Sequence, residues 1–401
     1  MTVADTLERT LLATSGGSVA ETLRDGLRLI RLYLGMSVAF VAEFREGERH
    51  FRYVDTDDSA APIQEGDSTP LSGTYCQAIV EGRIPQLMRD GENLPLLEEL
   101  GVTEEMQVRA AITVPIRLSD GTLYGTLCCA SSTPDESLRE RDVGLMQVFA
   151  GFAAQQLERD LGARREADQK AARIQEILDE SQFHIVFQPI VEIASGRVTG
   201  YEALTRFAAD PPRTPDVWFT EAAESGLGEE LELTTIRAAL AQLDAIAPEA
   251  YLSINVSPST VSSGAIERAL AGAPLPRLLL EVTEHDAIDD YAAFRGALAP
   301  LRARGLRLAV DDAGAGYASF RHILSVAPDV IKLDTSLTRD VDRDPSRRAL
   351  AAALIGFARE TGSQVVAEGV ETAAELETLR DLGATNAQGY FLGRPLPLPQ
   401  R

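Results

Sequence analysis

The chain has 401 residues, 45% of them hydrophobic, so its length predicts two domains, each large enough to bury its own core. With 61 acidic and 38 basic residues the formal net charge is −23, which argues against DNA or RNA binding because phosphate recognition needs a basic surface. The sequence contains neither a run of about 20 apolar residues nor a signal-peptide pattern, and its three cysteines lack disulfide spacing. We therefore expect a cytoplasmic protein without a membrane partner.

The first predicted domain, residues 1–160, alternates helical and strand patterns. Its predicted elements are, in chain order, a helix over 21–34, strands over 36–44 and 50–56, a hairpin over 109–132 and a helix over 140–161. The hairpin turns at Ser119-Asp120-Gly121, a sequence typical of tight turns. Because neighbouring strand residues face opposite ways, we expect one of Cys128 and Cys129 to face the core and the other to face away from it.

Two stretches, GTYCQAIVEGRIPQLMRD (73–90) and AAITVPIRLSDGTLYGTLCCAS (110–131), together with the closing helix, resemble a GAF domain. The resemblance implies a small α+β sensory module around an antiparallel sheet. The ligand of this module is unknown from the sequence. His50 lies in a polar run, which is the wrong setting for a haem ligand, and none of the cysteines has the adjacent histidine that is usual for bilin attachment.

Residues 161–182 predict a connecting helix, because they are rich in Ala, Glu, Arg and Gln and contain no proline. Ala167, Ala171, Ile174 and Leu178 have the spacing of a coiled-coil seam. Two interpretations stand equally: the helix packs on its own chain, or it pairs with a second copy. We expect a homodimer that forms through this helix, through the second domain, or through both.

The second predicted domain, residues 183–401, contains eight short apolar segments separated mostly by helical ones. The segments cover 184–191, 198–207, 251–258, 277–284, 306–314, 329–334, 363–371 and 386–393. Eight strands alternating with helices over about 200 residues predict an α/β fold, a closed (β/α)8 TIM-like barrel. The first two strands are joined by only seven residues, EIASGRV, so they must pair as an antiparallel hairpin and the barrel is irregular.

Polar residues stand near the end of almost every predicted strand. They are Glu202, Asn255, Glu281, Glu284, Asp311, Asp312, Lys332, Glu368, Glu371 and Gln388. Any one of them alone is more simply a helix cap or a solvated loop residue, and Asp334 is expected to be such a cap. As a set they converge on one face of the barrel, where oxygen ligands without His or Cys favour Mg²⁺ or Mn²⁺ over zinc.

This half closely resembles the EAL family of cyclic di-GMP phosphodiesterases. The resemblance rests on FQPIV, YEALTRF, NVSP, EVTE, DDAGAGYASF, IKLDTS, VAEGVET and QGYFLGRPLP, which occur in the family's order over residues 183–399. It implies hydrolysis of cyclic di-GMP to linear pGpG by two divalent cations, regulated by the GAF half. Several carboxylates close together would then be neutralised by the cations.

The resemblance also implies a role for each polar residue. The ligands of one cation would be Glu202, Asn255, Glu281 and Asp311. Asp311 would be shared with the second cation, whose other ligands would be Asp312 and, directly or through a water molecule, Glu368. The catalytic residues would be Lys332 and Glu368, which position or deprotonate the attacking water, and Glu371, which supports the site from the second layer.

Substrate contacts would come from Gln188, Arg206 and Gln388, and Glu284 would anchor the loop after the aspartates. In that loop Ala313, Ala315 and Ala318 stand where the family usually has Phe, Thr and Ser. Basal activity is therefore expected to be low until it is regulated.

Two other classes of function were weighed against hydrolysis. One is a catalytically silent receptor for cyclic di-GMP that signals through the connecting helix; the complete ligand set argues against it. The other is an enolase-like barrel with Lys332 as base, in which the motifs NVSP and QGYFLGRPLP have no role.

Overall fold

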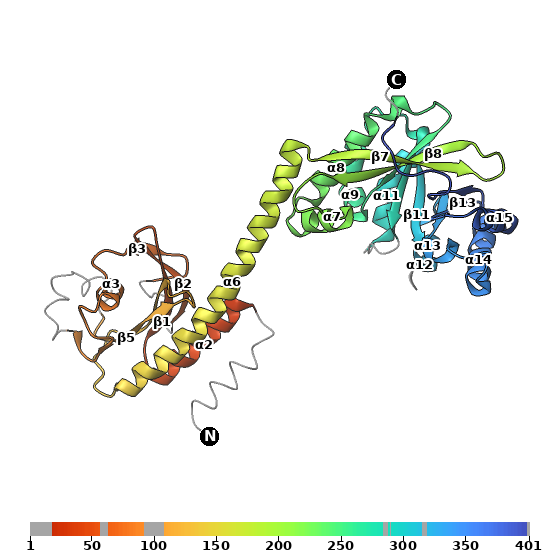
Figure 1. Cartoon of the computed structure of the whole chain (residues 1–401). Coiled ribbons are helices and arrows are strands. Elements are labelled where there is room, and N and C mark those ends of the chain that lie inside the picture. The colour runs from red at the N-terminus through yellow and green to blue at the C-terminus, as the bar shows by residue number, and fades with distance from the viewer. Residues whose placement is uncertain are drawn as a thin grey trace. The chain divides into compact units, whose positions relative to one another are not determined.

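The protein is described by a computed structural model that covers residues 18–56, 63–91, 108–283, 288, 290–314 and 319–398. The chain forms two compact units, Met1–Glu166 and Ala167–Arg401, and each is described by itself (Figure 1). Glu284, Ala315 and Ala318 lie outside the described residues. Over the described ranges, none of the helices combines the length and apolar character needed to cross a membrane.

The first unit is built on a six-stranded sheet in which every strand pair is antiparallel, in the order β3-β2-β1-β6-β5-β4. Its strands are β1 (Val38–Arg45), β2 (Glu48–Thr56), β3 (Ser68–Pro70), β4 (Leu87–Met88), β5 (Ala110–Arg117) and β6 (Leu123–Ser131). Its helices are α2 (Val19–Leu34), α3 (Tyr75–Val80) and the first part of α6 (Glu140–Glu180). The predicted hairpin is confirmed as β5 and β6.

Both faces of this sheet are covered, which corrects the expectation for the two adjacent cysteines. Cys129 packs with residues of α2 and α6 such as Leu27 and Met146. Cys128 packs on the opposite face with Phe40 and residues of α3. The alternation along β6 was predicted correctly, but neither thiol faces away from a core, because a sheet covered on both sides buries both of its faces.

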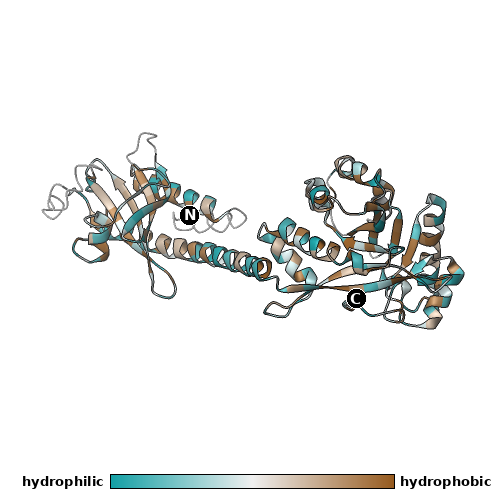
Figure 2. Ribbon diagram, turned by 90° about the horizontal axis from the view of Figure 1, so that it is seen from above, coloured by the Kyte–Doolittle hydropathy of each residue, from teal (hydrophilic) through white to brown (hydrophobic). Residues whose placement is uncertain are grey.

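Helix α6 runs without interruption from Glu140 to Glu180, past Gly162. Residues 162–169 are all exposed, and the middle of the helix is correspondingly hydrophilic in Figure 2. Beyond this stretch, Ile174 and Ile177 are buried against Trp218 of the same chain. Of the two interpretations of the seam, packing on its own chain therefore accounts for Ile174.

The second unit is a closed barrel with strand order β10-β11-β12-β13-β14-β7-β8-β9. Its strands are β7 (Phe183–Glu192), β8 (Val198–Phe207), β9 (Tyr251–Asn255), β10 (Leu278–Thr283), β11 (Arg307–Ala313), β12 (Val330–Leu333), β13 (Gln364–Ala367) and β14 (Asn386–Ala387). Strands β8 to β14 pair with one another in parallel, whereas β7 is antiparallel to both β8 and β14. The predicted irregular barrel is confirmed.

Helices cover the outside of the barrel (Figure 1). They are the rest of α6, then α7 (Pro215–Glu224), α8 (Gly228–Leu240), α9 (Pro258–Ser262), α10 (Ala265–Ala269), α11 (Tyr291–Arg302), α12 (Ser319–Val326), α13 (Thr335–Thr338), α14 (Pro345–Thr361) and α15 (Ala373–Leu382), with short 3₁₀ turns η2 (Leu243–Ala245) and η3 (Leu275–Arg277). The largest apolar core lies between helices and strands and includes Leu280, Phe294, Leu308 and Leu354. Asp334 caps α13 by accepting a hydrogen bond from the Ser336 N–H, as predicted.

A second, smaller apolar cluster lies inside the barrel. It consists of one residue from each of six strands: Ile190, Tyr251, Leu279, Ala309, Val330 and Val366. Side chains along a strand alternate between its two faces, so the residue two positions further along also points inward. This apolar layer therefore forms a floor, and the next inward layer determines the chemistry of the barrel.

Candidate active site

The inward layer above the apolar floor is polar and charged. On the parallel strands it lies two residues after the floor residue: Ser253, Glu281, Asp311, Lys332 and Glu368. On β7, which runs the opposite way, it lies two residues before Ile190, at Gln188. The strand period and the reversed first strand together bring these side chains to one end of the barrel.

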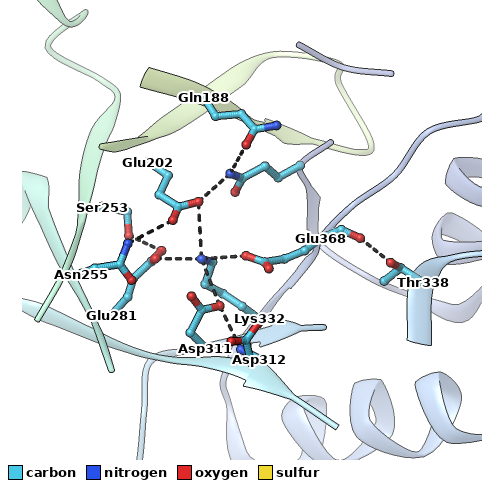
Figure 3. Close-up of polar contacts among 11 residues, drawn as sticks. Gln188, Glu202, Ser253, Asn255, Glu281, Asp311, Asp312, Lys332, Thr338 and Glu368 are labelled. Atoms are coloured by element: carbon cyan, nitrogen blue, oxygen red, sulfur yellow. Dashed lines mark hydrogen bonds and ion pairs between the residues drawn. The ribbon is translucent and has the colours of Figure 1, made fainter. Parts of the chain in front are cut away.

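Lys332 lies at the centre of this layer and is 1% exposed. Its Nζ atom is 2.6 Å from Glu368 Oε1 and 2.7 Å from Glu281 Oε2. It is also 3.1 Å from Asp311 Oδ1 and 3.6 Å from Glu202 Oε2 (Figure 3). One ammonium group thus contacts four carboxylates from four different strands or strand ends.

Amide side chains hold the Glu202 carboxylate on its other side. Asn255 Nδ2 donates to Glu202 Oε1 at 3.1 Å, and Gln388 Nε2 donates to Glu202 Oε2 at 2.6 Å. Gln388 Nε2 also reaches Gln188 Oε1 at 3.0 Å, and Gln188 Nε2 donates to the Gly393 carbonyl. Both carboxylate oxygens of Glu202 therefore accept from amides that come from other strands or strand ends.

The electrostatics of the layer are unbalanced. Burial raises the pKa of Glu281 and of Glu368 well above the ordinary carboxyl value, and neighbouring carboxylates raise it further against the opposing effect of Lys332. Burial alone would lower the pKa of Lys332, but its carboxylate neighbours, Asp311 first, raise it well above the ordinary value. Burial would also raise the pKa of Glu202, yet Lys332 and the two amides lower it overall. Lys332 is therefore charged, whereas Glu281 and Glu368 bind a proton more readily than an exposed carboxyl group does.

Two groups of carboxylates have the spacing of metal sites. Glu202, Glu281 and Asp311 place one oxygen each within 4.8 Å of one another, and so do Asp311, Asp312 and Glu368. Asp311 belongs to both groups, as a residue shared by two cations must. If all five carboxylates ionise against one ammonium, four negative charges remain, which two divalent cations would neutralise. Oxygen donors of this kind fit Mg²⁺ or Mn²⁺.

The backbone at these positions is specialised. Asp312 has a φ of 56°, in the left-handed region that non-glycine residues seldom adopt, and its N–H donates to Asp311 Oδ1. Gly369, directly after Glu368, has a φ of 63°, and a Cβ atom there would lie 2.4 Å from Thr335 Oγ1. A non-glycine residue held in the left-handed region, as Asp312 is, is typical of a functional site.

The remaining predicted residues lie around the layer rather than in it. Arg206 is half-buried, donates to the Thr205 carbonyl and lines a cavity of about 750 Å³ together with Asn255. Glu371 does not contact Lys332; both of its oxygens are 2.5 Å from the guanidinium of Arg339. Glu284 lies outside the described residues.

Three side chains that position the layer were missed from the sequence. Ser253 is fully buried and donates to Glu281 Oε1 at 2.5 Å, and the Thr338 hydroxyl donates to the Glu368 carbonyl. Glu375 is 2% exposed and accepts from the N–H groups of Asp340 and Glu371. Signals for two of them were present: Ser253 lies two residues before Asn255 on the same strand face, and Thr372 to Glu375 has the spacing of a capping box.

Comparison with protein families finds two domains in this chain. A family model described as EAL domain matches residues 171–395, and one described as GAF domain matches residues 18–157. The EAL match covers more than half of the chain.

Among curated proteins, the chain is 33% identical over 315 residues to the cyclic di-GMP phosphodiesterase PA2567 of Pseudomonas aeruginosa, covering 72% of this chain and 51% of that protein. The chain thus spans about half the length of that relative. It is also 32% identical to an uncharacterised signalling protein of Caulobacter vibrioides, covering 84% of this chain and 40% of that protein.

Among solved structures, the chain is 29% identical to the PaMucR phosphodiesterase in complex with c-di-GMP, with a TM-score of 0.52 over 57% of this chain and 98% of that one. The EAL enzyme Bd1971, in a form with bound cAMP and cyclic di-GMP, has a TM-score of 0.56 over 90% of this chain and 91% of its own. At 18% identity the second likeness concerns the fold alone.

The paired carboxylate groups predict a stabilising effect of Mn²⁺. At about 100 times its dissociation constant, an ion that binds only the folded state adds about 2.7 kcal/mol. For a unit of this size that corresponds to a rise in melting temperature of about 5 °C or more. Asp311→Asn, which alters both groups, should abolish the rise measured by scanning calorimetry.

Asp334→Asn is the matched control for this prediction. It removes the same charge just after β12, but asparagine caps a helix as well as aspartate does. The control should keep the full Mn²⁺ effect. A rise that survives Asp311→Asn would mean that the ion binds elsewhere.

Proposed function

The chain belongs to the EAL domain family and carries an N-terminal GAF domain, and on this basis we propose that it hydrolyses cyclic di-GMP to linear pGpG with two divalent cations. The supporting observation is the charged layer above the barrel floor, in which Asp311 belongs to two carboxylate groups at once. Related proteins named as cyclic di-GMP phosphodiesterases support the substrate. We propose residues 1–160 as the sensory domain, 161–182 as the connecting helix and 183–401 as the catalytic domain.

We assign the metal ligands to Glu202, Asn255, Glu281, Asp311, Asp312 and Glu368. When bound, the cations supply Lewis-acid activation of water and neutralise charge on the phosphate. Glu202 is already oriented by Asn255 and Gln388, and Glu281 by Ser253, so little reorganisation is needed to present their oxygens.

Lys332 and Glu368 act on the attacking water in this proposal. Their 2.6 Å contact holds the Glu368 carboxylate next to a donor that stays charged. The Glu368 carboxylate would accept a proton from the attacking water, and its contact with Lys332 holds it in place for that role. Lys332 then remains as the counter-charge.

Substrate contacts are assigned to Gln188, Arg206 and Gln388. The Gln388 side-chain carbonyl is buried and has no hydrogen-bond partner within the described part of the chain. It lines a cavity of about 300 Å³ beside Glu202 and Glu368, so a donor group of the nucleotide can satisfy it. Arg206 lines the larger cavity, and Leu204 borders both.

The second candidate function is a receptor that binds cyclic di-GMP without hydrolysing it. Ala313 is fully buried within the apolar core at the end of β11. Because this residue is an alanine and not a phenylalanine, it has no aromatic ring to anchor the loop that follows. Loss of that anchor is the feature that favours a silent or very slow protein.

The decisive assay follows pGpG by chromatography from cyclic di-GMP and Mg²⁺ or Mn²⁺. The wild type should form pGpG, and Glu202→Gln should lower kcat by about a hundredfold or more, because the charge on one cation ligand is lost. Glutamine keeps the shape of the side chain and can accept from either Asn255 or Gln388 through its one carbonyl oxygen. Circular dichroism should show that the fold persists.

Either of two results would contradict hydrolysis as the function. Tight binding of cyclic di-GMP without turnover would support the receptor instead. Equal turnover by wild type and Glu202→Gln would overturn the ligand assignment.

We propose that the GAF domain regulates the barrel through α6 and α7. The buried carboxylate of Glu221, on α7, pairs with Arg173 of α6 and with Arg213. The Arg213 guanidinium also stacks over the Trp218 ring at 4.9 Å, and Trp218 packs on Ile174. The end of α6 is therefore fastened to α7 by both charge and apolar contact.

The other side of α7 reaches the proposed substrate cavity. Asp216, Phe219 and Ala223 line the cavity of about 750 Å³ that also contains Arg206 and Asn255. A displacement of α6 that pulls on Glu221 would thus move one wall of that cavity, while the metal ligands stay on the strands.

Glu221→Gln should therefore raise KM for cyclic di-GMP severalfold and leave kcat within about twofold, since the loosened wall binds substrate and the strand ends do the chemistry. Steady-state kinetics of the full chain measures both. Glu224→Gln breaks the exposed Lys170 pair on the same helix, which contributes at most about 1 kcal/mol, and should change neither constant. An unchanged KM in Glu221→Gln would contradict the coupling.

We also expect a homodimer. Ile174 and Ile177 are already buried in their own chain, so the second copy must use other surfaces of α6, the barrel or both. Light scattering at micromolar concentration should give twice the chain mass of 43.3 kDa. A single species of one chain mass would contradict this expectation.

A further inference from the structure

The smaller cavity beside the charged layer has a wall that the proposed chemistry does not use. This cavity of about 300 Å³ is bordered by Glu202 and Glu368 on one side and by Thr335, Arg339, Glu371 and Tyr390 on the other. Arg339 is the only cation among the described residues that line it. A negatively charged ligand in this cavity would therefore meet one positive side chain of the protein, besides any bound cations.

Arg339 is held in place by a chain of contacts that leads to a buried carboxylate, that of Glu375. It follows α13, and its side chain forms two parallel hydrogen bonds with Glu371, each 2.5 Å long. The N–H of Glu371 donates to Glu375 at 2.9 Å, and so does the N–H of Asp340, the residue after Arg339. One buried carboxylate thus fixes the backbone on both sides of the Arg339–Glu371 pair.

The Glu375 carboxylate is surrounded by backbone N–H donors. Burial alone would raise the pKa of Glu375, but the backbone donors of Asp340, Glu371 and Thr372 lower it below the ordinary value. The carboxylate is therefore ionised and accepts from three backbone N–H groups, as well as forming a capping box with Thr372. An exposed ion pair contributes little by itself, so the buried Glu375 is what holds the backbone around Arg339 and Glu371.

Glu371 leaves most of the guanidinium available. An arginine has five N–H donors, and the fork of Glu371 takes two of them. The Arg339 side chain is 40% exposed, and no other acceptor is paired with it in the described part of the chain. Three N–H groups can therefore turn to a ligand in the cavity.

We propose that Arg339 binds a phosphate oxygen of the nucleotide and that Glu371 is a positioning residue that aims it. This inference rests on the proposed function and extends it to a further substrate-binding residue. Guanidinium groups match the geometry of phosphate oxygens and form charge-assisted hydrogen bonds to them. The phosphate is either a diester of cyclic di-GMP or the terminal phosphate of pGpG, and the two differ in charge.

The test compares Arg339→Met, Arg339→Lys and Glu371→Gln with the wild type. Losing charge-assisted bonds to phosphate should raise KM about tenfold in Arg339→Met with kcat within about twofold. The KM of Arg339→Lys should lie between those of the wild type and Arg339→Met, because lysine keeps the positive charge but cannot form two parallel hydrogen bonds as a guanidinium does. Glu371→Gln keeps Arg339 and should raise KM less than Arg339→Met does.

The inhibition constant of added pGpG separates the two phosphates. If Arg339→Met raises the inhibition constant of pGpG by a larger factor than it raises KM, the terminal phosphate of the product is the partner. If KM rises at least as much, the diester of the substrate is the partner. Arg343→Met is the matched control: its side chain is 79% exposed, it lies on the same turn without lining the cavity, and it should leave both constants unchanged.

A purely structural role would give a different pattern. If Arg339 served only to hold Glu371, Arg339→Met and Glu371→Gln would cause the same change, and the change would fall on kcat with KM unaltered. That result would overturn the inference, and so would an Arg343→Met effect as large as that of Arg339→Met.

Failure of the proposed function is distinguishable from failure of this inference. If the wild type binds cyclic di-GMP without hydrolysing it, calorimetric dissociation constants replace KM, and a tenfold weaker constant in Arg339→Met still supports the phosphate contact. Equal constants would overturn it. If the wild type neither binds nor hydrolyses cyclic di-GMP, both proposals fall.

Discussion

The second unit depends on one buried ammonium group. Lys332 is 1% exposed and contacts the carboxylates of Glu202, Glu281, Asp311 and Glu368. A lone buried charge is costly, and removing one member of a buried pair typically destabilises a protein by about 3–5 kcal/mol. Yet one ammonium cannot balance four carboxylates. The layer therefore contains more carboxylates than its ammonium group can balance, as the proposed cation site requires, and the apolar core between strands and helices must support it.

Strand direction explains how so many polar groups meet. The floor residues and the charged layer are two positions apart on each parallel strand, so the same offset repeats from β9 to β13. The reversed strand β7 contributes its polar residue on the other side of its floor residue, which places Gln188 against Gln388 and Glu202. The hairpin that makes the barrel irregular thus also brings Gln188 to Gln388, which is one of the two amides that donate to Glu202.

Repeating patterns were predictable, whereas single long-range contacts were not. Eight strands and the antiparallel hairpin followed from apolar segments and a seven-residue connection, and most candidate site residues followed from their places at strand ends. The Arg339–Glu371 pair joins residues 32 positions apart, and nothing in the local sequence of either indicates the other. Cys128 was predicted to alternate with Cys129, but whether both faces of a sheet are covered depends on helices elsewhere in the chain. Tertiary packing decides such cases.

Glu202 and its neighbours lie in the charged layer above the apolar floor, and the two cavities beside them have walls built in different ways. The larger cavity is bordered by α7, which is fastened to α6 by Glu221 and Trp218. The smaller one is bordered by Arg339 and Glu371, whose backbone Glu375 holds by accepting from the N–H groups of Asp340 and Glu371. A helix that continues into the GAF domain can move, but a turn held by buried backbone hydrogen bonds cannot move without losing them. Regulation is therefore expected to act on the α7 wall, and recognition of charge to remain with the Arg339 wall.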